Sequence, residues 1–299
     1  MRRGFARALG AILVLAMAGL SGGAQPSAPP GFLVQFEWQM VDPLFGGLSA
    51  IDVTDDGLGL TVLSDSGAFA TGTIARDKGG QITNIALAPF RRLKGLGEDP
   101  LAIGRDDSEG LAIDAQGAVY ISFEGVARVL RYADLAGSAQ NLPIPAEFKK
   151  LQSNSALEAL AIDGDGVLYT IPERSGSTRR PFPVFRFQNG VWDQKLSLRR
   201  EGGFMPVGAD FGPDGQLYIL LRQFHGLAGF SSRLIRMSVG EDSLGPPQVM
   251  IESPVGYHSN LEGVSIWRDG AGHLRATMIA DNNYLPFLPN AIVEYQLPD

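Results

Sequence analysis

Short apolar runs recur along the chain in pairs, and a turn rich in Asp and Gly separates the two runs of each pair. Alternating apolar and polar residues within such runs are typical of strands with one buried face. Glycine supplies the positive φ that tight hairpin turns need. The pattern therefore predicts a series of β-hairpins rather than long helices. The five turns are Asp56-Gly57, Gln116-Gly117, Asp165-Gly166, Asp214-Gly215 and Asp269-Gly270.

The hairpins repeat at a nearly constant interval. Aligning the first run of each hairpin gives separations of 62, 49, 49 and 55 residues between equivalent apolar positions. Repeats of about 50 residues are typical of four-stranded propeller blades, whereas a β-sandwich would not explain the period. An all-β propeller with five blades is predicted, with a sixth blade as the open alternative and residues 96–105 as a long loop. The equivalent positions are Ile51, Ile113, Ile162, Phe211 and Ile266.

The last repeat lacks a fourth strand before the sequence ends at Asp299, and a candidate for it lies at the opposite end. Apolar residues alternate with Gln35, Glu37 and Gln39, as in a half-buried strand. This N-terminal strand is predicted to complete the last blade and close the ring, which leaves no exposed sheet edge. Its apolar residues are Phe32, Val34, Phe36, Trp38 and Met40.

The first 24 residues have the three parts of a secretory signal peptide: arginines, an apolar run from Ala8 to Leu20, and small residues up to Ala24. The run is shorter than the roughly 20 residues that span a bilayer. We therefore expect cleavage after Ala24, no membrane insertion afterwards, and a periplasmic or secreted protein. The Arg2-Arg3 pair leaves the twin-arginine route open. Residues 25–30 are expected to be an extended lead-in, and residues 31–299 one domain.

Composition excludes several classes of function. The net charge of −7 offers no basic face for nucleic acid. The complete lack of cysteine excludes disulfides, thiolate metal sites and a cysteine nucleophile. With 44% hydrophobic residues, the chain can bury a large core. No Gly-x-Ser-x-Gly motif is present, so an α/β-hydrolase is excluded as well.

Charged residues recur at two positions of the repeat. The start of a first strand and the end of the second lie at the same end of a blade, because the two strands are antiparallel neighbours. Seven carboxylates and one guanidinium are therefore expected around one mouth of the central channel. Glu109, Glu158 and Glu262 begin first strands, where Gly47 and Val207 stand in the other blades; Asp65, Glu124, Glu173, Arg222 and Asp281 end second strands.

Carboxylates this close raise one another's pKa unless a cation enters. An oxygen-only ligand set suits a hard ion, so Ca²⁺ is the predicted cofactor, with Mg²⁺ or Mn²⁺ as alternatives. The predicted metal ligands are Asp65, Glu124, Glu173 and Asp281, and the predicted catalytic residues are Glu109, Glu158, Glu262 and His258. The competing interpretation is structural, with each Glu accepting N–H groups from the neighbouring blade.

Basic and amide side chains near this mouth are the candidates for binding an anionic substrate: Arg174, Arg222 and Asn283. Arg179 and Arg180 follow in the same loop as Arg174. The Asp163-Gly-Asp-Gly166 run is similar to a calcium loop, but it lacks the Glu that such loops carry, and a turn explains it better.

Several segments resemble the phytase-like domain family, the "esterase-like activity of phytase" family of exported bacterial proteins. They are Phe45-Gly-Gly-Leu-Ser-Ala-Ile51 with Leu63-Ser-Asp-Ser-Gly67, Ser108-Glu-Gly-Leu-Ala112 with Tyr120-Ile-Ser-Phe-Glu124, Leu157-Glu-Ala-Leu-Ala161 with Pro172-Glu-Arg174, and Leu261-Glu-Gly-Val264 with Asp281-Asn-Asn283. The resemblance implies an exported β-propeller and a hydrolase of esters or phosphoesters. The chain has only five lysines, which departs from the cation-rich site of propeller phytases.

The function expected from these observations is a metal-dependent hydrolase of phosphate or carboxylic esters, acting as a monomer on a small anionic substrate. Two alternatives stay open at this point. One is a lactonase-type propeller enzyme, which also uses a carboxylate-bound divalent ion. The other is a non-catalytic periplasmic binding or scaffold propeller, in which the acidic residues are structural.

Overall fold

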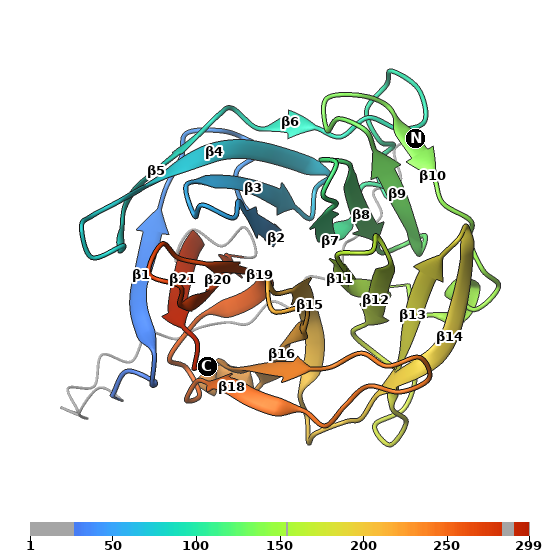
Figure 1. Cartoon of the computed structure of the whole chain (residues 1–299). Coiled ribbons are helices and arrows are strands. Elements are labelled where there is room, and N and C mark those ends of the chain that lie inside the picture. The colour runs from blue at the N-terminus through green and yellow to red at the C-terminus, as the bar shows by residue number, and fades with distance from the viewer. Residues whose placement is uncertain (1–26, 154, 283–289, 299) are drawn as a thin grey trace.

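The computed structural model describes residues 27–153, 155–282 and 290–298. Within these ranges the chain forms five antiparallel sheets that surround a central axis (Figure 1). The predicted five-bladed propeller is therefore confirmed, and the described ranges contain no sixth blade. They also contain no helix long and apolar enough to cross a membrane. The predicted signal peptide and Asn283 lie outside the described residues.

Each blade places its first strand next to the axis. Blade 1 comprises β2 (Leu48–Val53), β3 (Gly59–Ser64), β4 (Ala68–Arg76) and β5 (Ile82–Leu87), with β6 (Arg91–Arg92) beside β4. Blade 2 comprises β7 (Ser108–Ile113), β8 (Val119–Phe123), β9 (Arg128–Tyr132) and β10 (Ala139–Asn141). Blade 3 comprises β11 (Leu157–Ile162), β12 (Leu168–Pro172), β13 (Phe182–Gln188) and β14 (Val191–Leu198).

Blade 4 comprises β15 (Met205–Phe211), β16 (Leu217–Phe224), β17 (Phe230–Met237) and β18 (Gln248–Glu252). Blade 5 comprises β19 (Asn260–Arg268), β20 (Leu274–Asp281), β21 (Asn290–Gln296) and β1 (Phe32–Trp38). Two short 3-10 turns, η1 (Phe148–Lys150) and η2 (Gly226–Ala228), lie in connections.

The N-terminal strand closes the ring as predicted, because β1 pairs antiparallel with β21 as the outermost strand of blade 5. A buried ion pair adds to the closure. Arg76 of blade 1 contacts both carboxylate oxygens of Glu294 at 2.7 Å and stacks over the ring of Trp267 at 4.6 Å. Both ion-pair partners are almost fully buried. Blades 1 and 5 are therefore joined by charge as well as by apolar packing.

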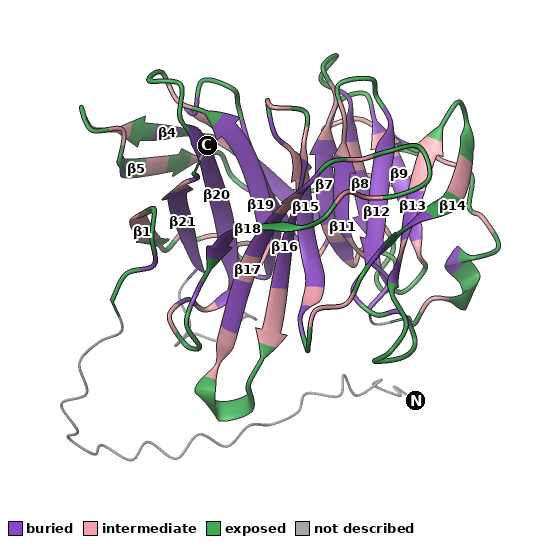
Figure 2. Cartoon of the chain, turned by 60° about the horizontal axis from the view of Figure 1, so that its bottom comes forward, coloured by how far each residue is buried: buried purple, intermediate pink, exposed green. Residues whose placement is uncertain are grey.

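The apolar core is divided among the blade interfaces. Five clusters of buried side chains are present, and each joins two neighbouring blades. The interface of blades 2 and 3, for example, packs Val129 against Leu160 and Phe185. Figure 2 shows the buried residues concentrated along the strands and the exposed ones in the connections. Packing between blades thus fixes where the ends of the inner strands lie.

The hairpin turns at one end of the blades follow the predicted chemistry with one correction. Gly57, Gly117, Gly166 and Gly215 have φ of 72, 83, 80 and 72°. In blade 5 the glycine with positive φ is Gly272, at 91°, rather than the predicted Gly270, because the five-residue turn begins at Asp269 and its fourth residue takes the positive φ, as in blades 2 to 4. The Asp163 side chain accepts N–H groups from Asp165 and Val167 at 3.0 and 2.9 Å. The Asp163–Gly166 run is therefore a capped turn.

Candidate active site

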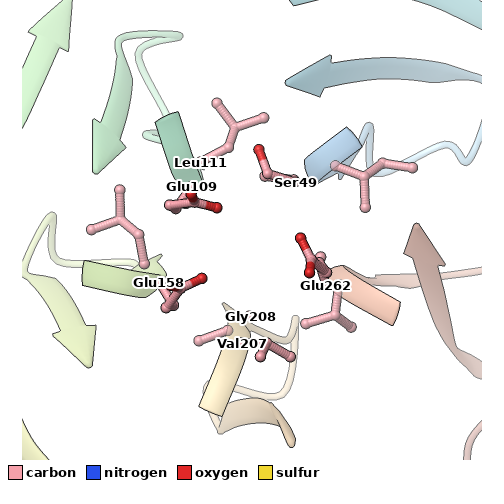
Figure 3. A pocket seen from close by; sticks show the side chains of 14 residues that line it. Ser49, Glu109, Leu111, Glu158, Val207, Gly208 and Glu262 are labelled. Atoms are coloured by element: carbon pink, nitrogen blue, oxygen red, sulfur yellow. The ribbon is translucent and has the colours of Figure 1, made fainter. Parts of the chain in front are cut away.

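A β-bulge occurs near the start of every first strand. In each blade the first strand has one extra residue relative to the second strand at this place. A bulge re-aims the side chain of the extra residue, and here the side chains point toward the central axis (Figure 3). The five bulge residues are Ser49, Glu109, Glu158, Val207 and Glu262.

The structure corrects the sequence alignment of blade 1 by two residues. Ser49, and not Gly47, occupies the position equivalent to Glu109. The apolar residue equivalent to Ile113 is accordingly Val53 rather than Ile51, since Val53 pairs with the start of β3 as Ile113 pairs with the start of β8. The first runs of blades 1 and 2 have a similar order of small and apolar residues, so the shift of two residues is not visible in the sequence.

Small residues follow the bulges and bring the inner strands close together. A Cβ on Gly110 would lie 2.6 Å from the Cβ of Leu160, and one on Gly208 would lie 2.6 Å from the carbonyl oxygen of Glu262. The cavity among the inner strands offers about 10 Å³ to the centre of a water molecule, roughly what one water requires. The channel therefore has no room for an organic molecule, and any ester must bind at its mouth.

The ends of the second strands lie at the same mouth. In each blade a charged residue follows the end of the second strand, and the residue just before it pairs with the residue just before the bulge. In blade 2, for example, Ser108 pairs with Phe123, which precedes Glu124. The register thus makes the charged residues equivalent around the ring and places them at the bulged end of the blades. These residues are Asp65, Glu124, Glu173, Arg222 and Asp281.

Arg222 occupies a position that is acidic in the other four blades, and it pairs with carboxylates on both sides. Its guanidinium contacts Glu262 and the side-chain oxygen of Asn260 in blade 5, and it lies 3.0 Å from Glu173 in blade 3. Asn260 also donates to Glu262 at 2.6 Å. The neighbouring carboxylates hold the pKa of Arg222 above its usual value, against the opposing effect of burial. Glu173 and Glu262 are therefore held by a buried cation.

The carboxylates of blade 2 lie in a different setting. One oxygen each of Asp107, Glu109 and Glu124 lies within 4.8 Å of the others. Burial raises the pKa of Glu109 well above its usual value, and the carboxylates of Glu262 and Glu124 raise it further. No ion pair joins Glu109 or Glu124 to a basic side chain in the described parts of the chain. The three carboxylates have the spacing of a cation site, and among the described residues Glu109 and Glu124 have no basic side chain to balance their charge.

A carboxyl–carboxylate hydrogen bond connects blade 2 with blade 3. Burial raises the pKa of Glu158, and the nearby Glu109 carboxylate and the hydrogen bond with Glu124 raise it further. Glu158 accordingly holds the proton that it shares with Glu124. The backbone N–H of Ala156 also donates to Glu124. A carboxyl group whose surroundings favour its protonated form thus lies beside the candidate cation site.

The surroundings of His258 change its interpretation, whereas those of Arg174 agree with the predicted role. His258 lies against β1 and β21, with its ring nitrogens 3.2 Å from Gln35 and 2.6 Å from the hydroxyl of Tyr295. Burial lowers its pKa to about 4, so the ring is neutral at pH 7. It is therefore part of an aromatic core rather than a free proton donor at the mouth. Arg174 is 55% exposed, and its Nε lies 3.6 Å from Glu173.

Asp107, which lies close to the predicted mouth in the sequence, and Asn260 were not among the predicted site residues. Both precede the bulge of their blades: the carbonyl of Asp107 accepts the N–H of Glu124, and Asn260 pairs with Asp281. The sequence signal was present in the Asp107-Ser-Glu109 spacing, but the role of the position became visible only with the register. Asp65 faces the Glu109 carboxylate closely enough to raise its pKa. Asp281 is buried at the end of β20.

Solved structures and curated sequences were compared with the chain. No curated sequence matches. Among solved structures, an α-L-arabinofuranosidase from Podospora anserina matches at 11% identity over 91% of this chain and 96% of that chain, with TM-score 0.52. An aldose sugar dehydrogenase from Streptomyces coelicolor matches at 13% over 91% and 100%, with TM-score 0.46. Regucalcin from Agrobacterium tumefaciens, a calcium-binding protein, matches at 13% over 85% and 77%, with TM-score 0.45.

At these identities the arabinofuranosidase supports the propeller fold and nothing beyond it, and the other two carry no argument. The family model is more informative. The model described as "Phytase-like: Esterase-like activity of phytase" matches residues 43–284, from just before blade 1 into blade 5. Because this match covers most of the chain, the protein belongs to the phytase-like, "esterase-like activity of phytase", family.

Proposed function

We propose that the chain is an exported hydrolase of phosphate or carboxylic esters that depends on a divalent cation at the channel mouth. The observation that carries this proposal is the group of Asp107, Glu109 and Glu124, whose oxygens lie within 4.8 Å of one another. The family's esterase-like description supports the reaction class. The cleaved signal peptide predicted over residues 1–24 supports export.

The donor set fits a hard cation. All three side chains offer only carboxylate oxygen, which suits Ca²⁺ first and Mg²⁺ or Mn²⁺ second. Asp107, Glu109 and Glu124 would hold the ion, with Asp65 facing the same group. When bound, such an ion polarises an ester oxygen and lowers the pKa of a bound water. Glu173 was predicted as a ligand, but its pairing with Arg222 assigns it to the other side of the mouth.

The remaining residues of the mouth have separate tasks. Glu158 holds a proton at its carboxyl group and can pass it to a leaving oxygen or recover one. Arg222 keeps Glu173 and Glu262 in place and is too fully engaged to bind substrate. Arg174 is the exposed cation at the rim and can orient an anionic substrate. The narrow channel keeps the substrate outside the ring.

The test is turnover of 4-nitrophenyl phosphate, 4-nitrophenyl acetate and a simple lactone, each with Ca²⁺, Mg²⁺ or Mn²⁺ and after chelation. We expect hydrolysis of at least one ester only when the ion is present. Glu109→Gln is expected to lower kcat/KM at least about 100-fold. Replacing a residue that only hydrogen-bonds to a metal ligand typically lowers activity about 10- to 100-fold, and loss of the ligand itself should lower it more. Circular dichroism checks that the fold is retained.

Glu37→Gln is the matched control, because the same substitution is made at an exposed residue on the outermost strand. It is expected to leave turnover unchanged. Hydrolysis of the lactone alone would favour a lactonase-type enzyme. No turnover with any ion would favour the non-catalytic binding propeller, and an unaffected Glu109→Gln variant would show that the site is wrongly assigned.

A further inference from the structure

A cleft lies beside the acidic mouth, between the β10–β11 connection and the outer strands of blade 3. It has a volume of about 400 Å³, within the range of small-molecule sites. Its cationic side chains are Lys150, Arg174 and Arg180, and Glu147 is its one acidic residue. In a chain of net charge −7 with only five lysines, three cations around one cleft form a local reversal of charge.

The cleft borders the channel mouth at Glu173, and its Gln152 precedes Ser153, whose carbonyl accepts the N–H of Gly125 at 2.9 Å, next to Glu124 of the proposed site. Arg174, at the wall of the cleft, directly follows Glu173, whose carboxylate pairs with Arg222 at 3.0 Å. The ends of β12 and β14 and the start of β13 border the cleft at the same end of the blades as the bulges. A substrate reaching the channel mouth can therefore extend into the cleft.

The loop that carries Arg180 is fixed by contacts of its backbone. The carbonyl of Arg180 accepts hydrogen bonds from Ser175 Oγ at 2.8 Å and from Arg200 Nε at 2.9 Å. The guanidinium of Arg200 in turn stacks on Phe182 at 4.0 Å. A fixed loop loses less entropy on binding a ligand than a mobile one. The position of Arg180 is thus set before any ligand arrives.

The charged groups of the cationic side chains in the cleft are free to contact a ligand. Arg180 and Lys150 are exposed, and among the described residues neither the Arg180 guanidinium nor the Lys150 ammonium makes an ion pair or a hydrogen bond. Arg174 has only its longer contact with Glu173. Guanidinium and ammonium groups that converge on one hollow bind oxyanions, with bidentate contacts from arginine.

We propose that this cleft binds an oxyanion, a phosphate or carboxylate, carried by the non-reacting part of the ester substrate. The inference rests on the proposed function in so far as the oxyanion belongs to the substrate. It narrows the substrate class to esters that carry a second anionic group. Such a group would be held at Lys150, Arg174 and Arg180 while the ester lies over the carboxylates of blade 2.

The test is calorimetric titration of inorganic phosphate, and in parallel acetate, into protein freed of metal on a chelating resin. A soluble chelator is avoided because it is itself an anion. The variant Lys150→Ala/Arg180→Ala is compared with Lys78→Ala/Arg91→Ala, which removes the same two kinds of charge at exposed positions of blade 1. Equal thermal midpoints show that all three proteins are folded.

We expect the cleft variant to bind phosphate at least about tenfold more weakly, or about 1.4 kcal/mol, because two charge-assisted contacts to the anion are removed. The control variant is expected to bind like the wild type. A preference for phosphate or for acetate identifies the oxyanion. Binding of neither anion, or equal loss in both variants, overturns the proposal.

The proposal of an oxyanion site and the proposal of ester hydrolysis can fail separately, because the titration needs neither metal nor turnover. Phosphate binding that depends on the cleft, without any ester hydrolysis, leaves this site standing and removes the proposed function. Ester hydrolysis by a protein that binds neither phosphate nor acetate in the titration removes the cleft alone.

Discussion

The two sides of the channel mouth contain carboxylates at equivalent positions of the repeat but in opposite electrostatic settings. On the side of blades 3 to 5, Glu173 and Glu262 pair with the buried guanidinium of Arg222. On the side of blade 2, Glu109 and Glu124 face other carboxylates, and burial raises the pKa of both. The same repeat therefore yields one neutralised and one unneutralised group of acids.

One residue produces this difference. The end of the second strand is acidic in four blades and is Arg222 in blade 4. A guanidinium reaches the acids of the blades on either side of it, but blade 2 is too far around the ring to be among its direct contacts. The unneutralised side thus needs protons or a cation, and this is where we place the ion.

The largest predicted effect is the loss of the internal cation. Arg222→Met should lower the free energy of unfolding by about 3–5 kcal/mol, because Glu173 and Glu262 both lose the buried guanidinium that pairs with them. Urea denaturation measures it.

Arg174→Met is the matched control, with the same substitution at the exposed guanidinium beside Glu173. It should change the free energy of unfolding by less than about 0.5 kcal/mol. A similar decrease in the free energy of unfolding in both variants would show that the buried Arg222 stabilises the fold no more than the exposed Arg174.

A smaller effect concerns pH. The raised pKa of Glu109 means that the folded chain retains a proton that the unfolded chain releases above about pH 4.5. The free energy of unfolding of the metal-free protein therefore falls as the pH rises, by up to about 1.4 kcal/mol per pH unit for one proton. Glu109→Gln should reduce this slope, and urea denaturation between pH 6.5 and 8.5 measures it.

His258 also contributes at the lower end of this pH window. Its pKa of about 4 in the folded state makes its contribution opposite in sign, lost as the pH falls below the unfolded value of 6.5. The histidine of the unfolded chain is still half protonated at pH 6.5, but this contribution is the same in the wild type and in Glu109→Gln and cancels when their slopes are compared. An identical slope in the wild type and in Glu109→Gln would mean that Glu109 is ionised throughout.

Much of the fold follows from local chemistry that a sequence displays. The turn at Asp163–Gly166 is specified by the Asp oxygen that caps it and by the glycine at positive φ. The alternation in β1 likewise indicates one face packed on the sheet, and the strand closes blade 5. These features depend on neighbours in the chain, so five blades and ring closure were predictable.

The details of the site depend on contacts between distant segments. The bulges that turn Glu109 and Ser49 toward the axis depend on the pairing register of the first two strands. The sequence alignment placed blade 1 two residues away from this register, so Ser49 was not recognised as the equivalent of Glu109. The aromatic surroundings of His258 come from β1 and β21, which lie far away in the sequence. The positions of the charged residues around the mouth could be predicted from the repeat. The pairing of Arg222 with Glu173 and Glu262 could not, because it joins three different blades.

The most direct test of the account compares Glu109 and Glu262, which occupy equivalent bulges on the two sides. Thermal unfolding is measured with and without millimolar Ca²⁺ for the wild type, Glu109→Gln and Glu262→Gln. At 100 times its Kd, the ion should add about 2.7 kcal/mol and raise the midpoint of the wild type and of Glu262→Gln by several degrees. Glu109→Gln should show no shift. Equal loss of the shift in both variants, or no shift in the wild type with Ca²⁺, Mg²⁺ or Mn²⁺, would contradict a cation site on the unneutralised side.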